Sequence, residues 1–201
     1  MTRLVLATRN RHKVREIAAI LAEAGAPVEL LGLDGFVASP EVEETGETLE
    51  DNALLKAHAG VNHTGLAAAA DDTGLFVDAL GGAPGVHAAR YSGENSTYEL
   101  NNRKLLAELA GVPAENRGAK FVCTVAYAAP GVAPMLFRGE LAGRILEAPR
   151  GANGFGYDPL FVPDGWGQTL AEMTAAEKNR ISHRNRAFRQ LAEHLKNTQT
   201  R

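Results

Sequence analysis

The chain has 201 residues, of which 45% are hydrophobic, with one cysteine and a formal net charge of −3. This is enough to bury a full core as one domain, residues 1–201, either undivided or in two lobes, with no need for disulfides. The single Cys123 excludes an internal disulfide and a cysteine-based zinc cluster, and the negative charge argues against binding along a nucleic-acid backbone. No window of about 18 apolar residues is present to span a membrane. The first strand begins at Leu4, leaving no room for a signal peptide, so we expect a cytoplasmic protein.

The chain opens with a predicted strand, turn and helix. Residues 4–7 form an apolar run, and Val14, Ile17 and Leu21 then recur at helical spacing. The turn at residues 8–13, TRNRHK, places a hydroxyl, an amide cap and a lysine around a helix N-terminus, whose free N–H groups favour anions. This predicts a phosphate site without glycines. The alternative is that Asn10 is a simple N-cap and Lys13 is solvated surface.

A second strand is predicted at residues 28–33, followed by an acidic segment at residues 40–47. Its charges are solvated by default, but one or two could turn inward to share a metal with Asp72, because Mg²⁺ prefers oxygen ligands. The sequence does not choose among them. Thr48 and Asp51 then have capping-box spacing and predict a helix to about residue 60, on which Asn52 and Lys56 lie one turn apart.

The stretch at residues 66–93 contains the expected chemical centre. Four alanines after Leu66 predict a buried strand, and Asp71-Asp72-Thr73-Gly74 is interpreted as the turn at its carboxyl end, where open α/β sheets bind ligands. Neighbouring strand residues point to opposite faces, so only one aspartate can aim straight at a ligand, and the loop must bend to use both. The side-chain-poor loop at residues 81–85 suits close approach of backbone to a ligand. The alternative for the acidic pair is helix capping or a solvated loop, and the alternative for residues 81–85 is an ordinary tight turn.

The next elements are packing elements. Ser96 and Glu99 predict the start of a helix that runs to about Leu109. Residues 121–129 and 135–145 are apolar and β-rich, and the loop at residues 130–134 between them predicts a long antiparallel hairpin. The predicted sheet is therefore mixed.

Two further segments carry candidate binding residues. The glycine-rich loop at residues 150–159 ends in aromatics and an acid, which suits a planar ring, because stacking on an aromatic face contributes ~1–3 kcal/mol per base. Core aromatics beside a turn are the alternative. Thr174 and Glu177 predict a C-terminal helix broken near Ser182, with three potential cations close to the break. Ordinary surface charge is the alternative for those cations.

Six motifs in this order resemble one family. They are TRNRHK at residues 8–13, EETG at 43–46, ADDTGL at 70–75, LGGAPG at 80–85, FGYDP at 155–159 and EKNRISHR at 177–184. The chain is similar to the non-canonical purine nucleoside triphosphate pyrophosphatases, the inosine triphosphatase or Ham1-like proteins, over essentially its whole length. The resemblance implies an elongated α/β fold with a long mixed sheet flanked by helices, two lobes around a nucleotide cleft, and a homodimer.

The resemblance also implies residue roles. Asp72 is expected to be the catalytic acid that holds Mg²⁺ and accepts a proton from the attacking water, with Asp71 in support and Glu43 or Glu44 completing the carboxylate set. Lys13 is expected to neutralise phosphate charge, and Phe155 to stack on the base while His183 and Arg184 donate toward it. The full set of expected substrate-binding residues is Thr8, Arg9, Asn10, Arg11, His12, Lys13, Thr73, Phe155, Gly156, Tyr157, Asp158, Lys178, His183 and Arg184.

The implied reaction converts a nucleoside triphosphate and water to the monophosphate and pyrophosphate. The implied substrates are dITP, ITP and XTP, whose removal cleans the nucleotide pool, and neither nucleic acid nor membrane is an expected partner. Two other functions stay open at this point. One is a nucleotide-binding module without hydrolysis, and the other is a pyrophosphatase for other modified nucleotides.

Overall fold

The computed structural model describes residues 2–36 and 42–199. Pro40 and Glu41 of the predicted acidic segment lie outside the described residues. Within the described part of the chain, the strands are β1 (Thr2–Leu6), β2 (Val28–Gly32), β3 (Ala67–Val77), β4 (Pro84–Gly85), β5 (Gly118–Ala129), β6 (Val132–Ile145) and β7 (Phe161–Pro163). The α-helices found there are α1 (Arg11–Glu23), α2 (Leu49–Thr64), α3 (Tyr98–Glu108), α4 (Ala175–Ile181) and α5 (His183–Gln199), and the short 3₁₀ turns are Leu33–Gly35, Asp78–Leu80, Ala88–Arg90 and Ala114–Asn116.

The strands form one mixed sheet in the order β2-β1-β3-β5-β6-β7, with β4 paired to β3 beside this path. Strand β1 is parallel to β2 and to β3, and Leu4 is the register partner of Leu30 in β2 and of Ala67 in β3. Strand β4 is antiparallel to β3, and β7 is antiparallel to β6. Parallel neighbours need crossover connections, which α1 and α2 provide. The predicted mixed α/β sheet with flanking helices is confirmed.

The chain folds as two compact units. Unit 1 contains the described parts of Met1–Asp72, Cys123–Gly139 and Arg184–Arg201, and unit 2 contains Thr73–Val122 and Glu140–His183. The chain passes from one unit to the other within β3, β5 and β6 and at the His183-Arg184 bond.

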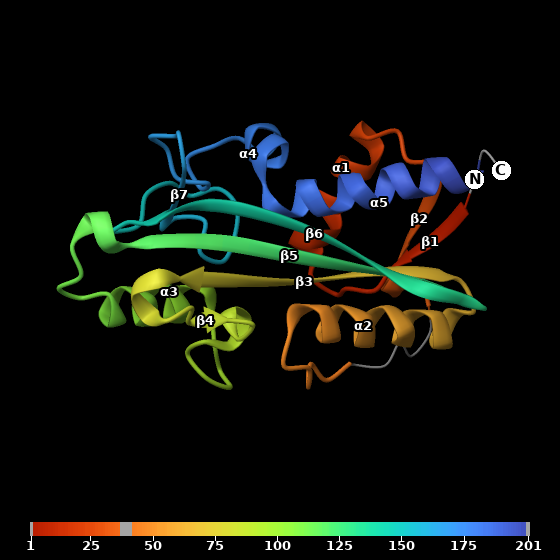
Figure 1. Ribbon diagram of the computed structural model, residues 1–201, viewed down its shortest axis with the longest axis horizontal. Coiled ribbons are helices and arrows are strands. Elements are labelled where there is room, and N and C mark those ends of the chain that lie inside the picture. The colour runs from red at the N-terminus through yellow and green to blue at the C-terminus, as the bar shows by residue number, and fades with distance from the viewer. Residues whose placement is uncertain (1, 37–41, 200–201) are drawn as a thin grey trace. The chain divides into compact units, whose positions relative to one another are not determined.

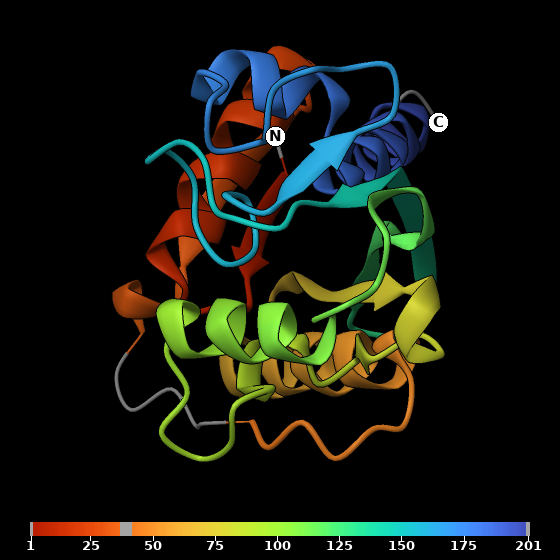
Figure 2. The same ribbon diagram turned by 90° about the vertical axis from the view of Figure 1, so that its left-hand side faces the viewer.

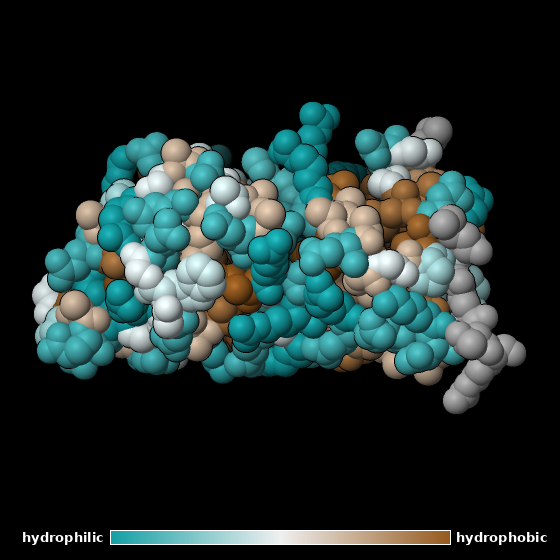
Figure 3. All heavy atoms as spheres, turned by 90° about the horizontal axis from the view of Figure 1, so that it is seen from above, coloured by the Kyte–Doolittle hydropathy of each residue, from teal (hydrophilic) through white to brown (hydrophobic). Residues whose placement is uncertain are grey.

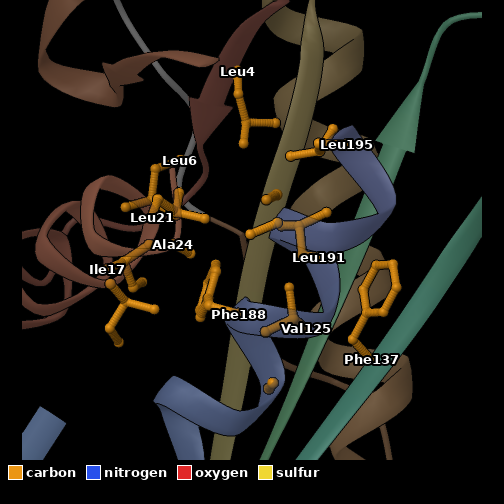
Figure 4. Packing of buried hydrophobic residues seen from close by; sticks show 14 of the residues in the cluster. Leu4, Leu6, Ile17, Leu21, Ala24, Val125, Phe137, Phe188, Leu191 and Leu195 are labelled. Atoms are coloured by element: carbon orange, nitrogen blue, oxygen red, sulfur yellow. The ribbon is translucent and has the colours of Figure 1, made fainter. Parts of the chain in front are cut away.

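Unit 1 buries apolar side chains on both faces of its strands. On one face, α1 and α5 pack against β1, β3 and β5, where Leu6, Ile17, Val125, Phe188 and Leu191 meet (Figures 1 and 4). On the other face, α2 packs against the strands (Figure 1). The buried residues of this cluster, in the part of the chain that the structure describes, are all alanines: Ala7, Ala53, Ala57, Ala70, Ala126 and Ala128. Because alanine is small, α2 lies close to β3, and its polar side chains come within reach of that strand.

Unit 2 has its own core. Leu105 of α3 and its C-cap residue Leu109 pack with Phe121 of β5 and Phe161 of β7, and Leu75 and Met173 belong to the same cluster. Helix α3 lies on one side of the strands of this unit and α4 on the other (Figure 2). The predicted capping box of α4 is present in both directions between Thr174 and Glu177, and the predicted helix break lies at Ser182.

The prediction of a turn at Asp71 to Gly74 is wrong. Strand β3 continues through these residues to Val77. The following Thr73, Leu75 and Phe76 favour extended backbone, and ion pairs compensate the burial of the aspartates, so nothing ends the strand. No bend is needed to use both carboxylates. The loop at residues 81–85 also serves the sheet, because its last residues form β4 against β3.

Several element boundaries differ from the prediction. Helix α3 is capped by Thr97, whose side chain accepts from the amide of Leu100, and not by Ser96. Helix α2 continues past residue 60 to Thr64, where Gly65 ends it in the left-handed conformation. The hairpin strands are longer than predicted, since only Pro130 and Gly131 separate β5 from β6.

Hydrophilic side chains cover most of the surface seen from the side of α1 and α5, and hydrophobic ones reach it in separate areas (Figure 3). This agrees with the amphipathic character of both helices, which bury one stripe and expose the rest. Among the residues described, none of the helices combines the length and the apolar character needed to cross a membrane.

Candidate active site

Asp71 and Asp72 lie side by side in β3 and point to opposite faces of unit 1. The preceding pair follows the same alternation, because Ala69 packs toward α1 and α5 while Ala70 packs toward α2. Asp71 therefore faces α1 and α5, and Asp72 faces α2. The side chain of Asp71 is fully buried, and that of Asp72 is 8% exposed.

Asp71 contacts two cations. Its Oδ2 lies 3.0 Å from Lys13 Nζ and 3.3 Å from both Nε and Nη2 of Arg184. Arg184 is itself fixed, because its Nη1 donates to Glu16 at 2.6 Å. Burial raises the pKa of Asp71, but Lys13 and Arg184 outweigh it and hold that pKa well below the usual range. The lowered pKa favours the ionised form of Asp71, whose ion pairs tie α1 and α5 to β3.

The turn before α1 positions Lys13. Asn10 is the N-cap, as predicted, and its Oδ1 accepts from the amides of His12 at 3.0 Å and Lys13 at 3.3 Å. Those two N–H groups are therefore engaged in the cap. Lys13 is not solvated surface, since its side chain is only 16% exposed and pairs with Asp71. Arg9, Arg11 and His12 are exposed at this helix end, whereas Thr8 is half-buried and its Oγ1 accepts from the Asn10 amide.

Asp72 has a different environment. Lys56 Nζ donates to its Oδ1 at 2.8 Å and to Glu44 Oε1 at 2.7 Å, so one ammonium joins two carboxylates. Asn52 Nδ2 donates to Asp72 Oδ2 at 3.3 Å. Burial raises the pKa of Asp72, and repulsion by Glu44 adds to this, while Lys56 opposes it without reversing it. Burial alone would lower the pKa of Lys56, but its two carboxylate partners raise it, so the lysine stays charged.

Asn52 and Lys56 were not predicted as functional residues. They lie four residues apart on α2 and so on one face, among the alanines that pack against β3. Asn52 also accepts from the Gly46 amide at 2.8 Å, which ties the EETG segment to Asp72. The spacing of Asn52 and Lys56 by one helical turn was the available signal in the sequence, but it did not show that Asn52 is buried beside Asp72.

The donor set beside Asp72 suits a hard cation. Two carboxylates converge on one positive charge, and Mg²⁺ is commonly held by one or two carboxylates together with substrate phosphates. Glu44 provides the second carboxylate, whereas Glu43 is exposed. Among the residues described, no three side chains of His, Cys, Asp or Glu converge into a complete metal cage. The residues therefore fit a metal that a ligand helps to hold.

Unit 2 holds the predicted planar-ring loop. Lys178 Nζ lies 2.6 Å from Asp158 Oδ2 and 4.6 Å from the centroid of the Phe155 ring. The same Asp158 oxygen accepts from the Phe155 amide at 2.8 Å. A Cβ at Gly154 would lie 2.1 Å from this oxygen, so only glycine fits there. These contacts fix a half-buried aromatic ring beside a buried lysine and acid.

Other predicted ring-binding residues have structural contacts. Tyr157 is a core aromatic, which was the alternative prediction for this loop. It is buried, and its hydroxyl donates to the Ala88 carbonyl oxygen at 2.8 Å. His183 is buried and stacks on Phe121 at 4.7 Å between ring centroids. Gly156 accepts from Asn102, and Thr73 is a half-buried residue of β3. Arg184 belongs to unit 1 and contacts Asp71 and Glu16 there.

Comparison with known proteins identifies relatives over nearly the full chain. The model of the Ham1 family matches residues 4–194. A dITP/XTP pyrophosphatase of Geobacter sulfurreducens is 57% identical, with 97% of each chain covered. The dITP/XTP pyrophosphatase of Streptomyces coelicolor is 51% identical over 95% of this chain and 96% of the relative. The solved structure of a HAM1 protein from Coxiella burnetii matches with a TM-score of 0.88 and 39% identity, covering 98% of this chain and all of the other.

Proposed function

This chain belongs to the Ham1 family, and from that membership and the site we propose that it hydrolyses non-canonical purine nucleoside triphosphates to the monophosphate and pyrophosphate. The proposed substrates are dITP, ITP and XTP, because the relatives at 57% and 51% identity are dITP/XTP pyrophosphatases. Loss of such nucleotides from the pool keeps deaminated bases out of DNA and RNA.

One observation carries the proposal. The two adjacent carboxylates on β3 have different charged neighbours. Asp71 lies between Lys13 and Arg184, which favour its ionised form, whereas Asp72 shares Lys56 with Glu44. Two carboxylates in environments that push their pKa values apart are typical of a division between a fixed charge and an acid–base group. This division supports Asp72 as the base that accepts a proton from the attacking water.

The other charged groups have supporting roles in this proposal. Lys13 and Lys56 carry the positive charge that a triphosphate requires, and each is oriented by an aspartate of β3. Arg184 and Glu16 act through Asp71, since they hold the carboxylate that positions Lys13. Arg9, Arg11 and His12 add exposed positive or titratable groups at the start of α1, next to the half-buried Thr8.

Mg²⁺ is the proposed cofactor, held by Glu44 and Asp72. When bound, it would polarise a phosphoryl oxygen and stabilise the charge of the leaving pyrophosphate. Glu44 is kept near Asp72 by Lys56 and by the Asn52 contact to Gly46. The chain itself thus prepares both oxygen donors.

Base recognition is proposed for Phe155, Asp158 and Lys178. The Phe155 ring provides a stacking surface, and the ammonium of Lys178 is a hydrogen-bond donor held by Asp158. A keto group at purine position 6 accepts from such a donor, whereas the amino group of adenine is itself a donor. The mismatch leaves buried donors unsatisfied at a cost of about 1–3 kcal/mol, which disfavours ATP.

The direct test is incubation of the protein with ITP and Mg²⁺, with separate assays for pyrophosphate and orthophosphate. We expect pyrophosphate and IMP in equal amounts. Release of orthophosphate contradicts the proposal and points to a phosphatase, and binding without turnover points to a nucleotide-binding module. A panel of ITP, dITP, XTP, GTP, ATP and dUTP separates the purine activity from a pyrophosphatase for other modified nucleotides.

We also propose a homodimer and a cytoplasmic location. The homodimer rests on the family resemblance. The location rests on the sequence features given above for Cys123 and Leu4, and it suits an enzyme that acts on the precursors of nucleic-acid synthesis. Light scattering coupled to size-exclusion chromatography tests the first, with twice the mass of one chain expected. Cell fractionation followed by immunoblotting tests the second.

A further inference from the structure

Helix α3 contacts the glycine-rich loop of unit 2 at two points. The ring of Tyr98 lies 6.0 Å from the ring of Phe155, measured between centroids, and the ring planes are inclined by 39°. Asn102 Nδ2 donates to the Gly156 carbonyl oxygen at 3.0 Å. Residues four apart lie on one face of a helix, so a single face of α3 touches consecutive residues of the loop.

The loop needs such contacts because its backbone is costly to order. Gly154 and Gly156, on either side of Phe155, have φ of +73° and +64°. Glycine loses more conformational freedom on folding than any other residue. In addition, Asp158 accepts from the Phe155 amide, and Lys178 Nζ lies 4.6 Å from the centroid of the Phe155 ring. Phe155 is therefore contacted both by this ionic pair and by Tyr98 of α3.

Only one of the two polar side-chain atoms of Asn102 is satisfied by a hydrogen bond among the described residues. Its Oδ1 is buried and has no hydrogen-bond partner among the described residues, while its Nδ2 bonds to the loop. A buried acceptor without a partner is destabilising. An amide that is only half satisfied contributes little to global stability, so its contact with Gly156 points to a role in the loop.

We propose that Tyr98 and Asn102 are positioning residues that hold the Phe155 ring where a purine base stacks. The inference rests on the proposed function in assigning the base to Phe155. Tyr98 supports the ring itself, and Asn102 supports the backbone that follows it. Their contacts with Phe155 and Gly156 lie within unit 2, whereas Asp72, Lys56 and Lys13 belong to unit 1. Their loss is therefore expected to weaken binding of the base while leaving the chemical step intact.

The kinetic test compares Tyr98→Ala, Tyr98→Phe and Asn102→Ala with the wild-type enzyme on ITP. Helix α3 tolerates alanine at both positions, since alanine is the best helix former. We expect KM to rise about threefold to tenfold in both alanine variants, the range set by an aromatic pair or one hydrogen bond, with kcat within twofold. Tyr98→Phe keeps the ring and is expected to restore the wild-type KM. Leu100→Ala, an exposed position of the same helix, is the matched control.

A double-mutant cycle with Phe155→Ala tests whether Tyr98 acts through the Phe155 ring. We expect Tyr98→Ala to raise KM in the wild-type background and to add nothing in the Phe155→Ala background. A full additional rise in that background overturns the proposal, as does an unchanged KM or a fall in kcat alone. Asn102→Ala is expected to raise KM without lowering the melting temperature, because it removes a buried unsatisfied acceptor. A lower melting temperature would make Asn102 a stability residue instead.

Hydrogen exchange of the ligand-free protein separates this inference from the proposed function. The amides of residues 153–157 are expected to exchange severalfold faster in Tyr98→Ala than in the wild type and in Leu100→Ala. If the exchange rates of these amides are unchanged in Tyr98→Ala, the proposal that α3 supports the loop is overturned, whichever substrate the enzyme hydrolyses. If exchange accelerates but the wild-type protein releases no pyrophosphate from ITP, the proposed function fails and the support of the loop stands.

Discussion

The two faces of β3 in unit 1 use the same residue type in different ways. Asp71 is fully buried and contacts Lys13 and Arg184, and Arg184 is fixed in turn by Glu16. Asp72, the next residue, is also buried and shares Lys56 with Glu44. The first arrangement places two cations on one carboxylate, whereas the second places one ammonium between two carboxylates. Two adjacent buried aspartates can therefore have pKa values shifted in opposite directions, according to the charges around each of them.

The largest effect is expected for Asp72→Asn, which tests the difference between the two aspartates. If Asp72 is the base, the change is expected to lower kcat on ITP by about 10³-fold, within the range for general-base catalysis, while nucleotide binding persists. Pyrophosphate release and calorimetric binding measure the two quantities. Asp164→Asn, at an exposed position, is the control. Turnover near the wild-type value would remove Asp72 from its role.

The second test concerns stability. Asp71→Asn leaves Lys13 and Arg184 without their shared carboxylate and is expected to lower the free energy of unfolding by about 3–5 kcal/mol, as for a broken buried ion pair. Asp72→Asn is expected to cost less, because burial and Glu44 already disfavour its charge. Denaturant unfolding of both variants measures the difference. Equal losses would mean that the two faces do not differ as described.

The third test concerns the metal donors. Glu44→Gln is expected to raise the Mg²⁺ concentration for half-maximal activity by about 10- to 100-fold, since it weakens one of two oxygen donors. Glu43→Gln, at the exposed neighbour, decides between the two glutamates, and we expect little change. Glu47→Gln is an exposed control in the same segment. A larger effect at Glu43 than at Glu44 would reverse the assignment.

The smallest effect is expected in the pH dependence. As pH falls through the raised pKa of Asp72, the base is protonated, and kcat/KM is expected to fall about tenfold per pH unit. Protonation of Asp72 favours the folded state, because its folded pKa lies above its unfolded one. The lowered pKa of Asp71 has the opposite sign, so its stabilisation is present above the unfolded value of about 3.9 and is lost as pH falls through the folded one.

Activity should therefore disappear at a higher pH than folded structure. A single pH series that records kcat/KM and circular dichroism measures both losses. If activity and structure are lost together, the two aspartates are not separated in the way that their surroundings indicate.

Local patterns predicted much of the fold. Helical spacing after Asn10, the capping box at Thr174 and the apolar runs of β5 and β6 predicted elements that the structure contains, because caps and periodicity act over a few residues. The turn at Asp71 was wrongly predicted for the same reason. Two adjacent acids are a turn signal only when nothing compensates their burial, and the compensating Lys13, Lys56 and Arg184 are distant in the sequence.

The sequence by itself determined the family, the mixed α/β sheet, the Asn10 cap and the set of chemically able residues, because these follow from motifs and short-range patterns. Only the tertiary structure decided which groups meet. It brought Lys56 and Asn52 to Asp72, paired Arg184 with Asp71, placed Glu44 in contact with Lys56 and buried Tyr157 in the core of unit 2. The physical reason is that burial and charge pairing depend on side chains from separate elements, which become neighbours only when helices pack against the sheet.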